Sequence, residues 1–353
     1  MTHPGPFEDS HRVIRPDPVN AEVRPEALWL EQTPAERFYI RSNFPFPPGT
    51  GEDQPLRLGG AVRQAREWTV GALLERVQRS LVVTTECASN GRTGFAPTPE
   101  GEPWRWSAVS TAEWTGVPLV ELLEEADVDP EAVEILFTGR DRGAAGDASG
   151  PIHFQRSLPL EKARDPDTLV ALAMNGAPIP LEHGAPLRLI VPGWYGMASV
   201  KWLESIEAIT QPFRGHFQHA RYRYEYADGS SAPVTVMRPR AIITDPVNNA
   251  RLPAGTVRIR GWAWSGQGPI DAVEVAVGGG DDVWQPARVE VPSSRHAWHR
   301  WTFDWIPSGP GLHILRCRAT DASGDRQPDH ARWNRHGYGN NAIHPTYVEI
   351  SAG

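Results

Sequence analysis

Residues 81–92 read LVVTTECASNGR, an apolar run that opens into a turn of small and polar residues. The apolar start, Leu81 to Val83, predicts a buried strand. Cys87 follows at the end of that strand and is one of only two cysteines in 353 residues. A cysteine in this position is well placed to be a metal ligand or a nucleophile. The alternative is an inert core thiol, because free cysteines are usually buried, and this stretch alone favours neither.

The composition is that of a globular chain with two or three domains. The 34 prolines, 33 glycines and 14 tryptophans favour a loop-rich, largely β architecture with large rings in its core. The net charge of −8 argues against a nucleic-acid partner, which usually needs a basic face. Two cysteines far apart in sequence make a disulfide framework unexpected and fit a reducing compartment.

The first 25 residues are polar and rich in proline, which predicts a flexible tail at 1–25. They contain no basic region followed by an apolar core, so we expect no signal peptide. No stretch approaches the roughly 20 apolar residues of a membrane helix, so no membrane association is expected. Together these features predict a cytoplasmic protein.

Short strands and short helices with long loops predict an α+β domain over residues 26–228. It lacks the steady strand–helix alternation of a doubly wound sheet. Helical spacing of apolar residues begins at Thr69, and a capping-box pattern predicts another helix start at Ser110. We expect a further helix at 116–123, strands at 36–43, 133–137, 169–174, 186–191 and 199–203, and a hairpin turn at 175–176.

A polar, turn-rich segment at 227–233 separates this domain from residues 234–353. Short strands with turns between them and no helical pattern then predict a β-sandwich. We expect the strands at 299–305 and 312–319 to pair with each other, and residues 278–282 to form a hairpin loop before a return strand at 283–291. Cys317 alternates with Leu315 on such a strand, which predicts a core position.

Familiar catalytic motifs are absent from the sequence: it has no Walker loop, no Gly-x-Gly-x-x-Gly, no His-Glu-x-x-His, no Cys-x-x-Cys and no Gly-x-Ser-x-Gly. Thiol catalysis by Cys87, with Arg92 lowering its pKa, stays open. The combination of one cysteine with many Arg, Lys, Trp and Gly-loop residues favours a large anionic cofactor. In that case one soft thiolate completes the coordination of a metal.

At this point the chain resembles the sulfite oxidase family of molybdenum enzymes, over nearly everything from about residue 30 to the end. The matching segments are 41–43 (RSN), 86–92 (ECASNGR), 110–119 (STAEWTGVPL), 174–176 (MNG), 183–188 (HGAPLR), 191–193 (VPG), 199–203 (SVKWL) and 261–266 (GWAWSG). The resemblance implies a mixed α/β molybdopterin-binding catalytic domain followed by an immunoglobulin-like dimerisation domain. It also implies a homodimer.

The resemblance further implies one molybdenum–molybdopterin cofactor in each chain, with Cys87 as the protein ligand of the metal. A soft anionic sulfur suits such a metal, and one cysteine suffices because the cofactor brings two dithiolene sulfurs. Cofactor-binding roles are implied for these residues: Asn43, Asp141, His183, Arg188, Ser199, Val200 and Lys201. Arginine and lysine bind phosphate through charge-assisted bonds.

By the same resemblance, Arg41, Arg92, Trp106 and Tyr222 surround the substrate. Guanidinium groups offer forked donors to an oxyanion and stay charged at any working pH. The family pattern Asp-Tyr-Lys is Arg-Tyr-Arg in this chain, and Tyr224 is the alternative to Tyr222. A C-terminal arginine is implied at Arg335, although the family places it where this chain has His336.

The implied reaction is oxygen-atom transfer that oxidises sulfite, or a similar small oxyanion, to sulfate. The sequence has no haem-binding domain and no Cys-x-x-Cys-His, so the electrons are expected to pass to a separate acceptor, a cytochrome or oxygen. The alternatives are a sulfane dehydrogenase-like enzyme and a reductase of sulfoxides or oxyanions. A cofactor-free binding protein of the same fold is a further alternative.

Overall fold

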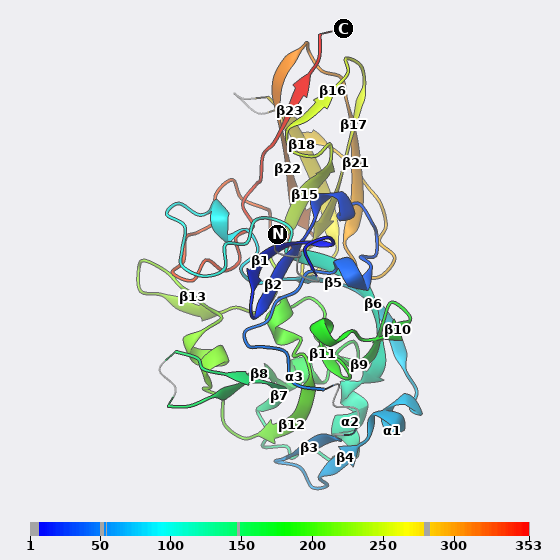
Figure 1. Cartoon of the computed structure of the whole chain (residues 1–353), viewed down its shortest axis with the longest axis vertical. Coiled ribbons are helices and arrows are strands. Elements are labelled where there is room, and N and C mark those ends of the chain that lie inside the picture. Colours follow the sequence, from blue (N-terminus) through cyan, green and yellow to red (C-terminus); the bar gives the residue numbers. More distant parts are fainter. Residues whose placement is uncertain (1–6, 50–52, 54, 147–148, 279–282, 353) are drawn as a thin grey trace, which may run out of the picture.

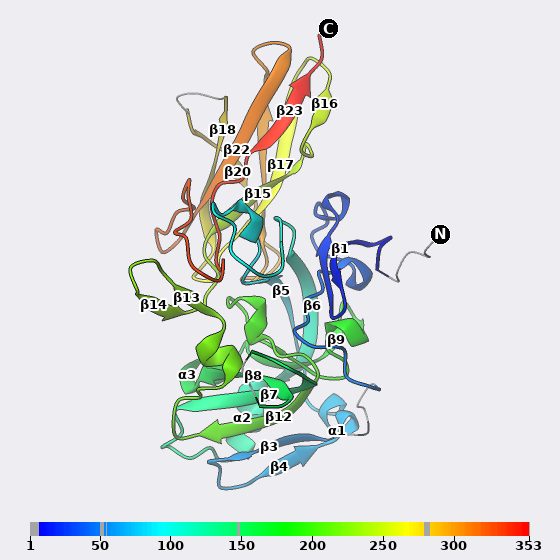
Figure 2. The ribbon, with the colours of Figure 1, turned by 60° about the vertical axis from the view of Figure 1, so that its left-hand side comes forward.

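The structure is a computed structural model that describes residues 7–49, 53, 55–146, 149–278 and 283–352. The molecule is elongated, with a mixed N-terminal domain at one end and a β-sandwich at the other (Figures 1 and 2). It is mostly β, and its longest helix has seven residues. Within the described ranges, no helix has the length and apolar character needed to cross a membrane.

An N-terminal hairpin forms where the sequence predicts a flexible tail, so that prediction is wrong for residues 11–23. Strands β1 (His11–Pro16) and β2 (Val19–Val23) pair antiparallel. The hairpin lies at the junction of the two domains (Figures 1 and 2). It is held there because the backbone of Ala21 exchanges two hydrogen bonds of 2.9 Å with Ile40.

The first sheet of the N-terminal domain carries Cys87. β5 leads directly into the cysteine turn, because its last residue is Glu86. The sheet order is β10-β9-β6-β5, with β11 also paired to β9. Its strands are β5 (Arg79–Glu86), β6 (Val109–Pro118), β9 (Leu169–Met174), β10 (Ala177–Pro178) and β11 (Arg188–Ile190).

The helix predicted from Ser110 is wrong, because residues 109–118 form β6. The capping-box pattern is local, whereas β6 pairs with β5 along residues 109–116 and with β9 along residues 114–118. Its β-branched residues, Val109, Thr111, Thr115 and Val117, also favour a strand. Tertiary pairing therefore overrides the local signal.

A second sheet closes the far end of the domain, with the order β4-β3-β12-β7-β8. Its strands are β3 (Leu56–Gly60), β4 (Arg66–Trp68), β7 (Glu134–Gly143), β8 (Ile152–Pro159) and β12 (Leu203–Ile209). The extended segment predicted at 199–203 is instead irregular, with bends, until β12 begins at Leu203. The strand predicted at 36–43 is also wrong, because Ala35–Arg37 form a 3₁₀ turn and only Ile40 makes an isolated bridge.

In the described part of the chain, three short α-helices pack on these sheets. They are α1 (Val70–Leu74), α2 (Leu119–Glu125) and α3 (Leu160–Ala163). Thr69 caps α1, since its hydroxyl accepts a hydrogen bond of 3.1 Å from the backbone of Ala72. The predicted helices at 69 and at 116–123 are thus confirmed, with slightly different ends.

The C-terminal domain is a sandwich of two sheets, preceded by the hairpin of β13 (Arg223–Glu225) and β14 (Ser231–Pro233). One sheet has the order β15-β17-β21-β20 and the other β16-β23-β22-β18-β19. The strands are β15 (Arg240–Asp245), β16 (Ala250–Leu252), β17 (Val257–Trp264), β18 (Ile270–Val277), β19 (Gln285–Pro286), β20 (Arg288–Val289), β21 (His299–Trp305), β22 (Gly311–Asp321) and β23 (Thr346–Ile350).

The predicted pairing of 299–305 with 312–319 is wrong, since β21 and β22 belong to different sheets. The predicted return strand at 283–291 is two short strands, β19 and β20, which also lie in different sheets. Residues 279–282 of the predicted hairpin loop lie outside the described part of the chain. Cys317 is buried among apolar residues, as predicted.

Tryptophans of the sandwich anchor it to the N-terminal domain. Trp262 and Trp298 stack with ring centroids 4.7 Å apart. The Trp298 indole N–H donates to the carbonyl of Glu31 at 2.8 Å, and the Trp264 indole N–H donates to the Glu86 carboxylate at 2.9 Å. Contact between the domains of one chain thus accounts for three of the tryptophans in this domain, Trp262, Trp264 and Trp298.

Candidate active site

Cys87 lies where β5 leaves its sheet. Its backbone N–H donates to Ala108 at 2.9 Å, and its carbonyl accepts from Asn90 at 2.9 Å, so the turn is held at both ends. Gly91 has a left-handed φ of 84°, and a Cβ there would lie 2.8 Å from the ring of Trp106. The cysteine is buried, but it lines a cavity, which separates it from an ordinary core thiol.

This inner cavity has an empty volume of about 610 Å³, including its open mouth. Most of the predicted site residues line it, although they come from segments far apart in the sequence. They are Arg41, Asn43, Cys87, Asp141, His183, Arg188, Ser199, Lys201 and Tyr222.

Two cations face this cavity, of which Arg188 is buried and Lys201 is half-buried. Arg188 follows a turn and begins β11; it donates to the carbonyl of His183 at 3.0 Å and lies over the ring of Trp114 at 4.9 Å. Lys201 Nζ donates to Ser42 Oγ and to the carbonyl of Glu182, both at 2.9 Å. Within the described residues neither cation forms an ion pair, and the Nε of Arg188 has no hydrogen-bond partner.

Burial disfavours the charged forms of these two groups. It lowers the pKa of Arg188 to about 10 and that of Lys201 well below its ordinary value. An anionic ligand would restore both pKa values and satisfy the orphaned donor. The inner cavity is therefore built for a negatively charged group.

Asp141 and His183 give this cavity acceptor groups as well. Burial raises the pKa of Asp141 to about 6, and its Oδ1 has no hydrogen-bond partner within the described residues. Burial lowers the pKa of His183, so the ring is neutral at pH 7. Because its Nε2 lies 2.7 Å from the carbonyl of Ala35, Nε2 carries the proton and Nδ1 is an acceptor.

The remaining predicted cofactor residues have different positions. Ser199 lines the cavity, and its hydroxyl accepts from the backbone of Val191 at 3.1 Å. Val200 is fully buried, and its carbonyl accepts from Leu189 at 2.8 Å, so its side chain belongs to the core. Ser42 and Tyr39 line the cavity but escaped the sequence analysis, although Ser42 lies within the matched 41–43 segment.

A second, outer cavity adjoins the first, because both are lined by Arg41, Asn43 and Tyr222. Its empty volume is about 980 Å³, open solvent included. Arginines dominate its charged lining. The charged or titratable lining residues are Arg15, Arg41, Arg92, Glu100, Glu102, His216, Arg221, Tyr222, His336 and Tyr338.

Arg41 and Arg92 both line this outer cavity, as the resemblance implies. Burial opposes the charge of Arg41, but its neighbours Tyr222 and Cys87 raise its pKa overall. Arg92 is held by the carbonyls of His336, at 2.7 Å, and Glu102, at 2.9 Å. Both guanidinium groups are thus fixed by neutral or backbone acceptors, which leaves their charge for a ligand.

Tyr222 lines both cavities, whereas Tyr224 lies against Tyr226 and away from them. The backbone of Tyr222 has a positive φ of 54°, which is rare for a tyrosine and points to a constrained position. Its hydroxyl lies 3.4 Å from Asn43 Nδ2, and its ring stacks on Tyr338 at 5.3 Å. The geometry therefore selects Tyr222 from the two alternatives, and Tyr338 is a site residue that the sequence did not suggest.

Two of the predicted substrate residues lie elsewhere. The side chain of Arg335 is 74% exposed, lines neither cavity and pairs with Glu225 at 3.4 Å, so its predicted place in the pocket is wrong. Its neighbour His336 lines the outer cavity instead. Trp106 supports the cysteine turn from behind, where it stacks on His344 with ring centroids 4.3 Å apart.

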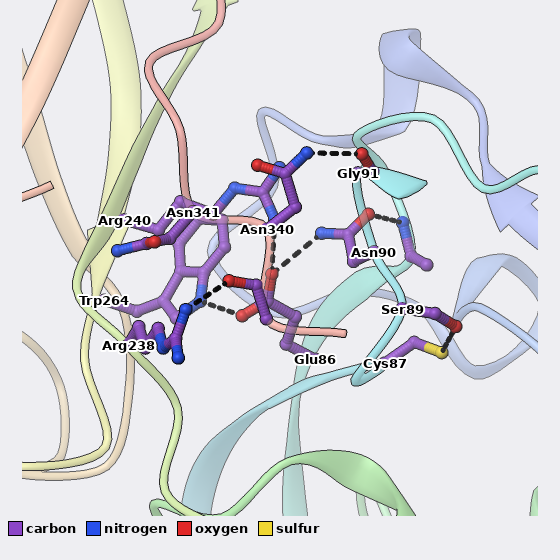
Figure 3. A network of polar contacts seen from close by, with 12 residues as sticks. Glu86, Cys87, Ser89, Asn90, Gly91, Arg238, Arg240, Trp264, Asn340 and Asn341 are labelled. Carbon is purple, nitrogen blue, oxygen red and sulfur yellow. Dashed lines mark hydrogen bonds and ion pairs between the residues drawn. The ribbon is translucent and has the colours of Figure 1, made fainter. Parts of the chain in front are cut away.

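The sandwich holds the cysteine turn through a buried polar network (Figure 3). Glu86 accepts from Arg240 at 2.6 Å, from Trp264 at 2.9 Å and from Asn90 at 3.0 Å. Asn340 donates to the carbonyl of Gly91 at 2.7 Å. The C-terminal domain thus fixes the residue before Cys87 and the turn after it.

Two family models match this chain. Residues 44–217 match the oxidoreductase molybdopterin binding domain, and residues 232–351 match the Mo-co oxidoreductase dimerisation domain. The second model covers the sandwich and the first covers most of the domain that carries both cavities.

Known relatives agree with these models. Human mitochondrial sulfite oxidase is 33% identical over 376 residues, which is 99% of this chain and 67% of the human protein. A nitrate reductase of Nicotiana tabacum is 30% identical over 88% of this chain but only 38% of its own length. The crystal structure of the sulfane dehydrogenase SoxCD from Paracoccus pantotrophus matches with a TM-score of 0.85 and 28% identity, over 99% of this chain and 91% of that one.

The chain therefore belongs to the sulfite oxidase family of molybdenum-dependent oxidoreductases. It spans about two thirds of the length of the human relative. Its fold is the molybdopterin-binding domain followed by the immunoglobulin-like dimerisation domain, as predicted.

The residues of the inner cavity fit the cofactor of this family. A cofactor phosphate matches the cations Arg188 and Lys201, which form no ion pair within the described residues. The acceptors on Asp141 and His183 match the N–H groups of a pterin ring. Among the described residues, no cluster of three His, Cys, Asp or Glu side chains offers an alternative metal site, so the lone thiol of Cys87 suits a metal that arrives with its own sulfur ligands.

Proposed function

We propose that this protein oxidises sulfite to sulfate and passes the electrons to a separate acceptor. One observation carries the proposal: the thiol of Cys87 lines the inner cavity, and three groups for oxyanion binding line the outer cavity that adjoins it. These groups are the guanidinium groups of Arg41 and Arg92 and the hydroxyl of Tyr222. When bound, the molybdenum cofactor supplies two-electron oxygen-atom transfer.

The arginines attract and orient the substrate. Sulfite is a small oxyanion, and a guanidinium offers it paired N–H donors in a fixed plane. On a chain of net charge −8, a local pocket of arginines gives the anion a defined destination. The proposed role of Tyr222 is to donate a hydrogen bond to a substrate oxygen, in a position fixed by Asn43 and Tyr338.

Cys87 has the proposed role of metal ligand, and we do not assign it a nucleophilic role. A nucleophilic cysteine needs a neighbouring base. The sulfur of Cys87 lies 3.4 Å from Ser89 Oγ, and a serine hydroxyl does not act as a base at neutral pH. The cofactor-binding roles of Asn43, Asp141, His183, Arg188, Ser199 and Lys201 are part of this proposal.

The acceptor is a cytochrome or oxygen, and the chain acts as a homodimer. The match of residues 232–351 to a dimerisation domain supports the second point. Sedimentation equilibrium at micromolar concentration is expected to give twice the mass of 39.0 kDa. A monomer under these conditions would contradict the proposed assembly.

A second candidate is the oxidation of a larger sulfur compound, such as a sulfane group carried by a partner. The similarity to SoxCD over 99% of this chain and the empty volume of the outer cavity, about 980 Å³ with open solvent included, favour this candidate. A substrate panel separates the two. Oxidation by the holoenzyme is measured with a dye acceptor and either sulfite or thiosulfate as the substrate. Reduction is measured with the reduced dye and either a sulfoxide or nitrate. Fastest turnover with sulfite supports the main proposal.

A further inference from the structure

The N-terminal hairpin reaches the substrate site although it precedes both matched domains. β2 is joined to the segment around Arg41 by the two hydrogen bonds between Ala21 and Ile40. This register places Asn20 opposite Arg41 and Ser42. Arg15 of this hairpin lines the outer cavity, and Asn20 contacts Arg41, which lines both cavities.

Asn20 is fully buried, and its amide makes three contacts. Oδ1 accepts from the backbone N–H of Ser42 at 2.9 Å and from Nη1 of Arg41 at 3.2 Å. Its Nδ2 donates to the carbonyl of Pro18 at 3.0 Å, which fixes the orientation of the amide and makes Oδ1 the acceptor. A buried amide used in this way is a rigid holder for the arginine.

The hydrogen bonds of Arg41 use only some of its N–H donors. Nη1 donates to Asn20 and to the carbonyl of Ser42, and Nη2 donates to Asn43 Oδ1 at 2.7 Å. These three bonds use three of the five N–H groups of a guanidinium. Since Arg41 lines both cavities, the other two are available to an anion held where the cavities meet.

Asn20 is a neutral amide, and this affects the charge available at Arg41. A carboxylate at position 20 would neutralise the charge that an oxyanion needs, whereas an amide orients the guanidinium and leaves its charge intact. The same hairpin also contacts the support of the second arginine. Arg15 pairs with Glu102 at 3.1 Å, and the carbonyl of Glu102 accepts from Arg92.

We propose that Asn20 is a positioning residue of the substrate site, which holds the guanidinium of Arg41 in the orientation that binds the oxyanion. The proposal rests on the sulfite-oxidising function proposed above and extends that site to the hairpin at 11–23. It assigns Asn20 an effect on substrate affinity, not on cofactor retention or the chemical step.

The test uses the holoenzyme with Asn20→Ala and Asn20→Asp. Each is expected to raise the KM for sulfite about tenfold, a size typical of residues that orient a ligand-binding group. The kcat and the molybdenum content stay near the wild-type values. Asn20→Asp keeps both acceptor contacts but adds a negative charge beside Arg41, so it tests the need for a neutral holder even if the alanine variant folds poorly.

Asn175→Ala is the matched control. Asn175 also accepts from a backbone N–H and donates to a backbone carbonyl, both at 3.0 Å, but it lines neither cavity. Its KM is expected to be unchanged. In an Arg41→Gln background, Asn20→Ala should add no further rise in KM, because the group that it orients is gone.

Sulfate binding to the same holoenzymes, measured by calorimetry, separates the positioning role from the proposed reaction. If the wild type binds sulfate but does not oxidise sulfite, the proposed function fails. Weaker sulfate binding by both Asn20 variants still supports the positioning role. The positioning role would be overturned if both Asn20 variants kept the wild-type KM and sulfate affinity. It would also be overturned if the effects of Asn20→Ala and Arg41→Gln on KM were additive, or if the wild type bound no sulfate.

Discussion

Glu86 and Arg240 form an ion pair of 2.6 Å that joins the two domains, and both side chains are almost fully buried. The residue after Glu86 is Cys87. The carboxylate is also bound by Trp264 and Asn90, so the C-terminal domain fixes the backbone from which the thiol projects (Figure 3). The dimerisation domain therefore helps to shape the cysteine turn of its own chain.

Replacement of Arg240 tests this relationship. Arg240→Met leaves the Glu86 carboxylate buried without its countercharge, which costs on the order of 3–5 kcal/mol of unfolding free energy. We also expect a reduced molybdenum content, because the cysteine turn loses its anchor. Chemical denaturation and metal analysis measure the two effects.

Arg258→Met is the control for that experiment. Arg258 pairs with Asp304 at 2.8 Å, but both side chains are more than half exposed, so its loss should leave stability unchanged. Equal stability of the Arg240 and Arg258 variants would contradict a structural role for the buried pair.

Asp141 is expected to make the stability of the folded chain depend on pH. Burial raises its pKa to about 6 in the folded chain, against an ordinary value of 3.8, so the folded chain binds the proton more tightly. Stability from this group therefore rises as the pH falls from about 7 towards 4. Asp141→Asn should be more stable than wild type at pH 7, and the advantage should vanish near pH 4.

Denaturation of the cofactor-free chain at several pH values measures this difference, which is at most about 3 kcal/mol for a shift of about two pKa units. Asp271→Asn, at an exposed position, should show the same dependence of stability on pH as the wild type. A constant difference between Asp141→Asn and wild type at all pH values would show that Asp141 has an ordinary pKa.

Arg41 and Arg335 should differ in their effect on substrate binding. Arg41→Gln removes a charge-assisted contact with the oxyanion, worth about 1.5–3 kcal/mol, so the KM for sulfite should rise roughly 10- to 100-fold. Arg335→Ala removes only a surface ion pair with Glu225 and should change neither KM nor kcat. Steady-state kinetics on both holoenzymes decide the point, and a large effect at Arg335 would reverse our assignment.

The sequence predicted the contents of the inner cavity better than its surroundings. His183, Arg188, Ser199 and Lys201 lie in motifs whose order and spacing carry the signal. Asn20 lies outside any such motif, in a segment whose prolines suggested a tail. Its role depends on pairing with Ile40 and on contact with Arg41, which local composition does not encode.

Other errors have the same origin. Ser110 carries a helix-start pattern, but it pairs with Thr85 of β5, and residues 114–118 of the same strand pair with β9. Arg335 and His336 are adjacent in sequence, and only the course of the chain decides which side chain faces the cavity. Long-range pairing and chain direction thus limit what local patterns can predict.

The most direct test of the account is metal content and sulfite turnover measured together in wild-type protein and Cys87→Ser, expressed with adequate molybdenum. We predict roughly one molybdenum and sulfite-dependent reduction of an artificial acceptor in the wild type. We predict loss of that activity in a Cys87→Ser variant that is still folded. Less than about a tenth of an equivalent of molybdenum in the wild type, or full activity in Cys87→Ser, would contradict the assignment of Cys87 as the ligand of a molybdenum centre.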